Sequence, residues 1–275
     1  EDPPVYEQAC TDVCEVDLVP SDDFIHFNPD FHNVPDVAPK DVNGDGIDDG
    51  PVAQTLACIG PQGIDGCGYE SPLENMLQAL NPGKAWNDPD EGDPFLRDSA
   101  TLAVAIVTDE ADCSIKNWSI LTDDEYQNDK PGSGLVPSSA ICWNAGVECD
   151  GPDQDGIYTN CAAKNDGELQ ETTRYINYLV GELRENQHKN VVMLGVVGIP
   201  EVVRDEDGEI VDGGVEDLVY RDWEEADILP EDVADGIDAA HQQWAFGIGP
   251  GCTGYDEDSD TYTGQAIPPV RVKEV

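Results

Sequence analysis

Two apolar segments separated by an amphipathic stretch constrain this fold more than any other feature of the sequence. Residues 102–108 and 190–200 are runs of small and β-branched side chains without the alternation of a half-exposed strand. Continuous runs of this kind are typical of parallel strands that are buried on both faces. Between them, residues 168–187 repeat apolar side chains such as Leu169 and Leu183 at helical spacing. Strand, helix and strand in this order predict a βαβ crossover, the unit of an α/β fold with a doubly wound, mainly parallel sheet.

Two further helices are predicted on either side of this unit. The segment "SPLENMLQAL" offers Ser71 as N-cap, Pro72 at the first helical position and Glu74 where a capping box requires it. Residues 231–244 form a second amphipathic stretch, which would direct Val233 and other apolar side chains toward the core. Long stretches rich in Gly, Pro and Asp separate these elements, so we expect long acidic loops.

The chain has nine cysteines, which is many for a cytosolic protein of 275 residues. No C-x-x-C pair indicates a zinc site, so disulfides formed in an oxidising compartment are the better interpretation. We therefore expect an extracellular or outer cell-surface location, with local pairs Cys58–Cys67 and Cys142–Cys149 stapling the loops. Because nine is odd, one thiol stays free or has a partner outside this chain.

The net charge limits the partners that this chain can bind. The sequence has 59 acidic and 13 basic residues, a formal net charge of -46. A phosphate backbone or an anionic lipid surface would be repelled, whereas divalent cations would be attracted. No apolar run approaches membrane-spanning length. We expect no nucleic acid, no direct membrane insertion, and a protein or surface ligand as partner, with self-assembly as an option.

The first apolar run ends in a cluster of oxygen-bearing side chains, Thr108, Asp109 and Glu110. In an open parallel sheet, ligands bind just beyond the carboxyl ends of the strands. Carboxylates at such an end can hold a hard cation, with the hydroxyl as a neutral oxygen ligand. The alternative is that Asp109 only caps the turn that follows.

A second candidate cation site is the segment "DVNGDGIDDG". Its oxygen ligands would fall at positions 1, 3, 5, 7 and 9 of a loop of EF-hand type, namely Asp41, Asn43, Asp45, the Ile47 carbonyl and Asp49. Position 12 is Val52 rather than Glu, and no flanking helices are evident, so a complete EF-hand is not expected. The spacing favours Ca²⁺, and the alternative is a plain acidic, glycine-rich turn.

Three motifs resemble the von Willebrand factor A-like domains of secreted, cysteine-rich proteins from myxobacteria and related bacteria. "LAVAIVTDEADCS" is similar to the family's central strand and acidic loop, and "GIDGCGYESPLENMLQAL" to the segment leading into the preceding helix. "CTGYDEDSDTYTGQAIPPVRVKEV" is similar to its cysteine-containing C-terminal region. The resemblance covers residues 55–275 and is clearest at 64–81 and 101–114.

The resemblance implies a metal-ion-dependent adhesion site, in which three loops hold Mg²⁺ or another divalent cation. It places Asp109 in the third loop, and Glu70 and Ser71 in the second, where the family usually has a Thr. The first loop, D-x-S-x-S, is absent, since "DCSIK" at 112–116 lacks the second Ser and lies in the wrong place. Either the first strand and its loop precede Glu1 or the site is degenerate. We favour the first explanation, because a single parallel strand pair and an odd cysteine suggest an incomplete domain.

Together these features predict two regions. Residues 1–54 would form an acidic N-terminal extension with the calcium-type loop, and residues 55–275 a von Willebrand factor A-like α/β domain with insertions, incomplete at both ends.

The residues favour binding over catalysis. The four histidines occur singly, and no H-E-x-x-H, G-x-S-x-G or P-loop motif is present. We expect a cation-dependent adhesion protein. The alternatives are, second, a calcium-stabilised subunit of an extracellular filament or surface layer and, third, a secreted hydrolase that uses an acid such as Asp109.

Overall fold

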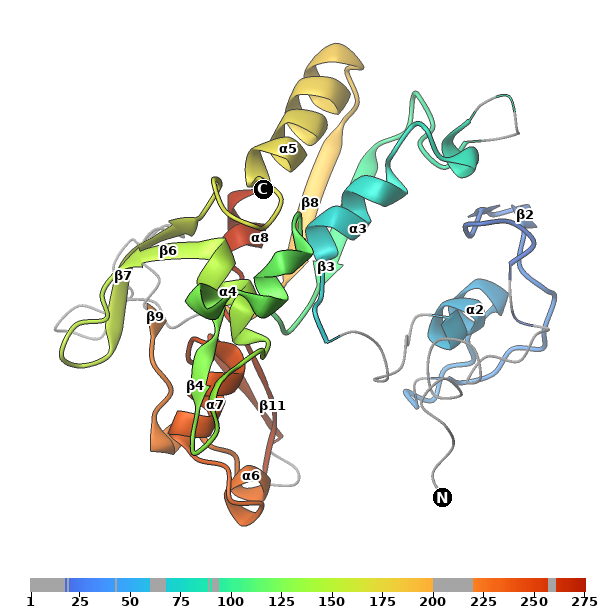
Figure 1. The fold of residues 1–275 in the computed structure, drawn as a ribbon. Helices are drawn as coiled ribbons and strands as arrows, with labels where there is room; N and C mark the ends of the chain where they lie inside the picture. The colour runs from blue at the N-terminus through green and yellow to red at the C-terminus, as the bar shows by residue number, and fades with distance from the viewer. Residues whose placement is uncertain are drawn as a thin grey trace, which may run out of the picture. The chain divides into compact units, whose positions relative to one another are not determined.

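The computed structural model divides the chain into two compact units (Figure 1), and each is described here by itself. The residues that the structure describes are 18, 20–42, 44–59, 68–88, 90, 94–199, 220–256 and 261–275. The first unit combines Glu1–Gly68 with Pro82–Phe95, and the second combines Tyr69–Asn81 with Leu96–Val275. The predicted boundary between residues 54 and 55 therefore falls inside the first unit.

The first unit contains little regular structure. Strands β1 (Phe27–Asn28) and β2 (Phe31–His32) form a short antiparallel pair, followed by helix α2 (Pro51–Ile59) and the single turn η2 (Ala85–Asn87). The buried side chain of Asn33 ties the β1–β2 segment together. Its Nδ2 donates to the Phe24 carbonyl at 2.7 Å, and its Oδ1 accepts from the His26 amide at 2.7 Å.

The centre of the second unit is the predicted strand–helix–strand arrangement. Strand β3 (Leu102–Val107) pairs in parallel with strand β8 (Val191–Val196). The intervening helix begins as α5 (Thr172–Ile176) and continues with wider π-helical turns as η5 (Asn177–Asn186). The structure therefore confirms a mixed α/β fold with one parallel strand pair, while the described residues form no larger parallel sheet.

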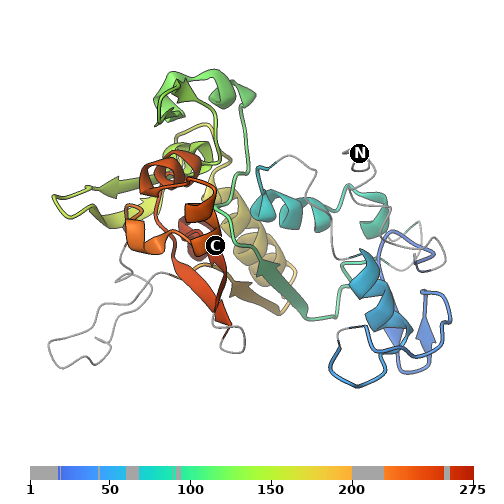
Figure 2. The same cartoon turned by 90° about the horizontal axis from the view of Figure 1, so that it is seen from below.

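Helix α3 (Pro72–Ala79) and the α5–η5 helix cover one face of this strand pair (Figure 2). The buried core between them consists of Leu73, Met76, Leu77, Leu80, Ile106, Tyr175, Leu179, Leu183 and Val272. The opposite face is apolar but exposed, since Val107, Val192 and Leu194 are 73%, 52% and 61% exposed. The prediction that both strands are covered on both faces is wrong for this structure, because both helices pack against the same side.

The remaining elements belong to the second unit. They are η3 (Trp118–Thr122), η4 (Asp124–Tyr126), β4 (Asn128–Lys130), β5 (Gly134–Val136), α4 (Ala140–Gly146), β6 (Val147–Asp150), β7 (Ile157–Ala163), β9 (Tyr220–Arg221), η7 (Glu225–Asp227), α6 (Pro230–Ala234), α7 (Ala239–Phe246), β10 (Cys252–Asp256), β11 (Thr261–Ala266) and α8 (Val270–Glu274). Strands β6, β7 and β9 form an antiparallel sheet, and β4–β5 and β10–β11 are two-stranded antiparallel pairs.

The predicted continuous helix over residues 231–244 is wrong. The chain forms the two short helices α6 and α7 instead, and Val233 is 58% exposed. Gly236 lies between them at φ +82°, a left-handed conformation that interrupts an α-helix. Asp238 then starts the second helix, because its side chain accepts a hydrogen bond from the His241 amide at 2.8 Å.

The disulfides differ from the predicted local pairs. Cys142 bonds to Cys113 rather than to Cys149, and Cys149 bonds to Cys161. The antiparallel pairing of β6 with β7 explains the second bond, because it brings Cys149 opposite the segment that holds Cys161. Cys58 is also disulfide-bonded, but its predicted partner Cys67 lies outside the described residues. Among the cysteines that the structure describes, Cys252 is free and exposed.

Candidate cation site at the end of strand β3

The carboxyl end of strand β3 lies beside the loop that precedes helix α3. Thr108 follows the strand directly, is buried, and donates its amide hydrogen to the Val196 carbonyl of β8 at 3.2 Å. Its hydroxyl donates to a carboxylate oxygen of Glu70 and accepts from the Glu110 amide at 3.2 Å. The end of strand β3 thus brings the Thr108 hydroxyl into contact with Glu70 from the segment before α3 and with Glu110 from the segment after β3.

A pair of hydrogen bonds joins the same two segments a few residues further on. The Cys113 amide donates to the Glu70 carbonyl at 2.6 Å, and the Ser71 hydroxyl donates to the Cys113 carbonyl at 2.7 Å. Helix α3 begins at Pro72 as predicted, but Ser71 makes no side-chain cap. Instead, Ser71 connects the segment before α3 to the segment after β3.

The predicted capping box is also wrong, because Glu74 is used elsewhere. Its carboxylate forms an ion pair with Arg174 of α5 at 2.7 Å and accepts from the Tyr175 hydroxyl at 3.1 Å. The amide groups at the start of α3 are satisfied from the other segment, since Asp112 accepts from the Leu73 amide at 3.2 Å. Helix α3 is therefore anchored by distant side chains rather than by its own cap.

At the strand end, the Glu70 and Asp109 carboxylates lie close enough to Glu110 to affect its ionisation. Burial first, and then the neighbouring carboxylates of Glu70 and Asp109, together raise the pKa of the Glu110 carboxyl to about 7. Asp109 itself is exposed, and its backbone carbonyl accepts from the Ile267 amide at 2.7 Å. The Glu110 carboxyl therefore ionises at a higher pH than is usual for a glutamate.

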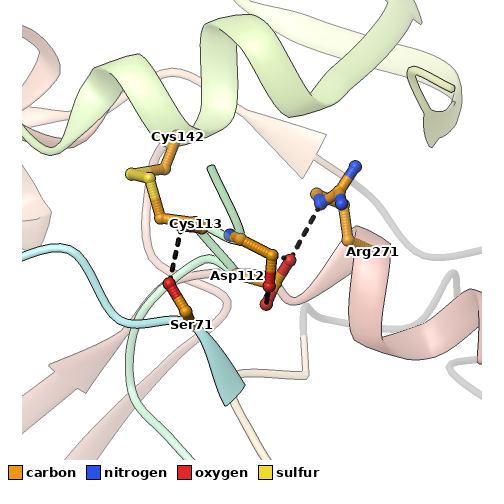
Figure 3. Close-up of a disulfide and its surroundings, with 6 residues drawn as sticks. Ser71, Asp112, Cys113, Cys142 and Arg271 are labelled. Atoms are coloured by element: carbon orange, nitrogen blue, oxygen red, sulfur yellow. Dashed lines mark hydrogen bonds and ion pairs between the residues drawn. A yellow bond between two sulfur atoms is a disulfide. The ribbon is translucent and has the colours of Figure 1, made fainter. Parts of the chain in front are cut away.

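The third acid of the segment, Asp112, faces Arg271 (Figure 3). It is buried and pairs with the Nε of Arg271 from helix α8 at 3.0 Å. The adjacent Cys113 carries the disulfide to Cys142 of α4. The acids after β3 thus serve two purposes, since Asp109 and Glu110 lie at the strand end whereas Asp112 anchors the interior.

Arginine at position 271 is the residue that the sequence analysis missed. It lies within the apolar segment "IPPVRV", and a buried guanidinium requires a carboxylate partner. The apolar surroundings of Arg271 in the sequence could have indicated a buried ion pair. No nearby residue, however, identifies its partner as Asp112, which lies 159 residues away.

The acidic loop of the first unit has a different geometry. Asp41 accepts hydrogen bonds through both carboxylate oxygens, from the Gly44 amide at 2.7 Å and from the Gly46 amide at 2.9 Å. Both glycines have positive φ, +80° and +83°, which the tight turn requires.

Backbone amides also donate to the carboxylates of two further acids in the predicted ligand set. Asp45 accepts from the Ile47 amide at 2.7 Å, and Asp49 accepts from the Val42 amide at 3.2 Å. The structure thus brings Asp41, Asp45, Ile47 and Asp49 into one turn, while the predicted ligand Asn43 lies outside the described residues.

Neither the end of strand β3 nor the 41–49 loop offers enough side-chain ligands in the described residues to enclose an ion. In the described part of the chain, no three His, Cys, Asp or Glu side chains converge closely enough to hold a metal. A cation at the strand end would draw on Glu70 and Asp109, with the Thr108 hydroxyl as a neutral oxygen, and would keep water in its other positions.

Comparisons with known proteins find no counterpart for this chain. No protein-family model matches it, and neither curated proteins nor solved structures give a match. The resemblance to von Willebrand factor A-like domains therefore rests on the motifs quoted above. Among the helices of the described residues, none is long and apolar enough to cross a membrane.

Proposed function

We propose that this chain is a secreted or cell-surface protein that binds a partner through a divalent cation at the end of strand β3. The proposed fold is a von Willebrand factor A-like, doubly wound domain, of which the β3–β8 pair is the described part. The observation that carries the proposal is the contact between Thr108 and Glu70, which joins the acidic ends of two segments beside Asp109 and Glu110.

Electrostatics supports a cation at this position. The charged form of Glu110 is disfavoured here, because burial first and the Glu70 and Asp109 carboxylates second raise its pKa. A divalent ion reverses the sign of the interaction, because each carboxylate then faces a positive charge. The net charge of -46 adds a long-range attraction for cations.

The partner in this proposal supplies an acidic group. An ion held by Glu70, Thr108 and Asp109 retains open coordination positions, and a carboxylate from another protein or surface can fill one of them. Direct contact between two acidic surfaces would otherwise be repulsive, so the cation explains how a chain of this charge binds an acidic partner. The Cys113–Cys142 and Cys149–Cys161 disulfides are consistent with an extracellular setting.

Calorimetric titration with Mg²⁺ and Ca²⁺ tests the proposed site. The titrations use a chain in which Asp41→Asn and Asp45→Asn remove the charges of the first acidic loop, so that the remaining heat comes from the strand end. Adding Asp109→Asn should weaken binding by about 100-fold, since a carboxylate ligand is lost.

The matched control is Asp129→Asn, which removes the same charge from an exposed position on β4. The control should bind the cation as the parent does. Equal affinities of the Asp109→Asn chain and the control would contradict the strand-end site.

A second candidate function is a calcium-stabilised subunit of an extracellular assembly. The exposed apolar face of the β3–β8 pair favours it, because parallel strands are normally covered on both faces. Sedimentation velocity in calcium and in chelator tests it. Calcium-dependent association would support the subunit, and a single species of monomer mass under both conditions would contradict it.

A further inference from the structure

Strand β3 has an open outer edge in the described part of the chain. Leu102 and Thr108 donate their amide hydrogens to carbonyls of the β8 segment. Because successive residues of a strand direct their amides to opposite sides, Ala103, Ala105 and Val107 direct theirs away from β8. Among the described strands, none pairs with this side of β3. We call the outer side of these three residues the β3 edge.

The β3 edge is apolar as well as open. The side chains of Ala103, Ala105 and Val107 are exposed, and they continue the exposed apolar face of β8. Soluble proteins usually protect edge strands with charged residues or Pro, because an open apolar edge pairs readily with other chains. Strand β3 contains neither, whereas strand β4 contains Asp129 and Lys130. The composition of β3 is therefore that of a strand with a neighbour on its outer side.

The carboxyl end of the β3 edge is acidic. Asp109 lies just beyond the strand and is exposed. The exposed Glu70 reaches the same end, since its carboxylate accepts a hydrogen bond from the Thr108 hydroxyl. The whole chain has a formal net charge of -46. A partner that extends past this end is therefore attracted if it carries Lys or Arg there and repelled if it carries an acid.

A second copy of this chain does not match this surface. The two strands have six residues each, so their exposed face measures roughly 20 Å by 10 Å, or about 200 Å². Stable interfaces bury about 800 Å² on each partner. A second copy also brings the same acidic end and another charge of -46. An added strand needs less area, because main-chain hydrogen bonds along the open edge contribute to its affinity.

We propose that the β3 edge binds an extended segment of another protein as an added strand. In this segment apolar residues alternate with polar ones, and Lys or Arg follows at the end that lies beside Asp109. Its main chain pairs with Ala103, Ala105 and Val107, and its apolar side chains lie on the exposed face next to them. This inference goes beyond the proposed function, because it requires no bound ion.

A labelled synthetic peptide tests the inference by fluorescence anisotropy in chelator. In this probe valine alternates with threonine, and two lysines follow at one end. One control peptide has glutamates in place of the lysines, and it should bind at least about tenfold more weakly because like charges then meet. The other control has proline in place of the threonines, which removes the amide donors, so it should not bind detectably.

Two substitutions in the β3 edge test the same contact from the side of the protein. Ala105→Pro removes an outward amide without removing a hydrogen bond to β8, and affinity for the lysine probe should fall by about fivefold. Val107→Lys places a charge on the edge, and affinity should fall by about tenfold. Because Val107 is 73% exposed, this chain should still fold, and it decides the question where Ala105→Pro does not fold.

The matched control is Val233→Lys, the same change at an exposed position on α6. It should bind the lysine probe as the parent does. Equal binding of the lysine and proline peptides, or equal affinities of the Val107→Lys and Val233→Lys chains, would overturn the inference. A dimer of the parent in chelator that Val107→Lys dissociates would also overturn it, because a second copy would then occupy the edge. Calcium or magnesium titrations bear on the proposed function alone, since these measurements contain no free ion.

Discussion

The two acid-rich segments of this protein orient their carboxylates by different means. In the 41–49 loop, amide groups of the same turn hold Asp41, Asp45 and Asp49. At the end of β3, the organising contacts come from residues 38 to 159 positions away, Glu70 and Arg271 among them. The first segment is thus a local structure, whereas the second exists only when the unit is folded.

The comparison teaches that similar composition does not imply similar energetics. Amide donors stabilise the charged form of a carboxylate. At the strand end, burial and, second, the carboxylates of Glu70 and Asp109 raise the pKa of Glu110 to about 7. Substitutions in the two segments should therefore differ in both size and pH dependence.

The largest expected effect is that of Asp112→Ala. It leaves the Arg271 guanidinium buried without its charge partner, and such losses cost about 3 to 5 kcal/mol of the free energy of unfolding. Urea denaturation measures this loss. In the absence of calcium, Asp41→Ala in the exposed loop should cost less than about 1 kcal/mol. Equal effects would mean that the two segments do not differ as described.

The disulfides provide the next comparison. Cys113–Cys142 closes 29 residues and Cys149–Cys161 closes 12, so chain entropy predicts losses of about 4 and about 3 kcal/mol on replacing each pair by alanine. Removing the first pair should also weaken the strand-end site, because Cys113 joins its two segments. A smaller loss of stability for the first pair than for the second would contradict this assignment.

Calcium should act on the 41–49 loop through mass action. At a hundredfold excess of free calcium over the dissociation constant, the stability of the folded loop should rise by about 2.7 kcal/mol. Thermal melting in chelator and in millimolar calcium detects this effect. It should disappear in the double variant Asp41→Ala, Asp45→Ala, and its persistence there would place the stabilising ion elsewhere.

The smallest effect is the pH dependence of the strand end. Because the pKa of Glu110 is higher in the folded chain than the usual 4.5, the folded state binds the extra proton between those values. Stability is therefore highest below pH 4.5 as far as this group is concerned and falls as the pH rises to about 7. Partial exposure limits the loss to about 1 to 2 kcal/mol. Glu110→Gln should remove this component, and an unchanged pH slope of stability would show that the carboxyl titrates normally.

Local patterns predicted part of this structure correctly. The parallel strands, the helix between them and the start of α3 at Pro72 all follow from periodicity and from residues close in sequence. The turn at 41–49 follows from its glycine and aspartate spacing. The helix start and the turn are decided by residues close in sequence, whereas the strand pairing joins segments far apart, such as Leu102 with Val191.

Several of the errors have a different cause, namely contacts between distant residues. Spacing suggested Cys142–Cys149, but the fold brings Cys113 beside Cys142. Asp112 belongs by sequence to the strand-end acids, yet its partner is Arg271. The exposed face of the β3–β8 pair was also missed. Apolar runs indicate that a strand favours burial, but they do not show whether another element covers it.

The most direct test of the strand-end cation is a crystal of this chain soaked in Mn²⁺, with the ion located by its anomalous scattering. The proposed function predicts a peak within coordination distance of the Asp109 and Glu70 carboxylates, together with a second peak in the 41–49 loop. A loaded 41–49 loop with no peak beside Asp109 would contradict cation binding at the end of strand β3.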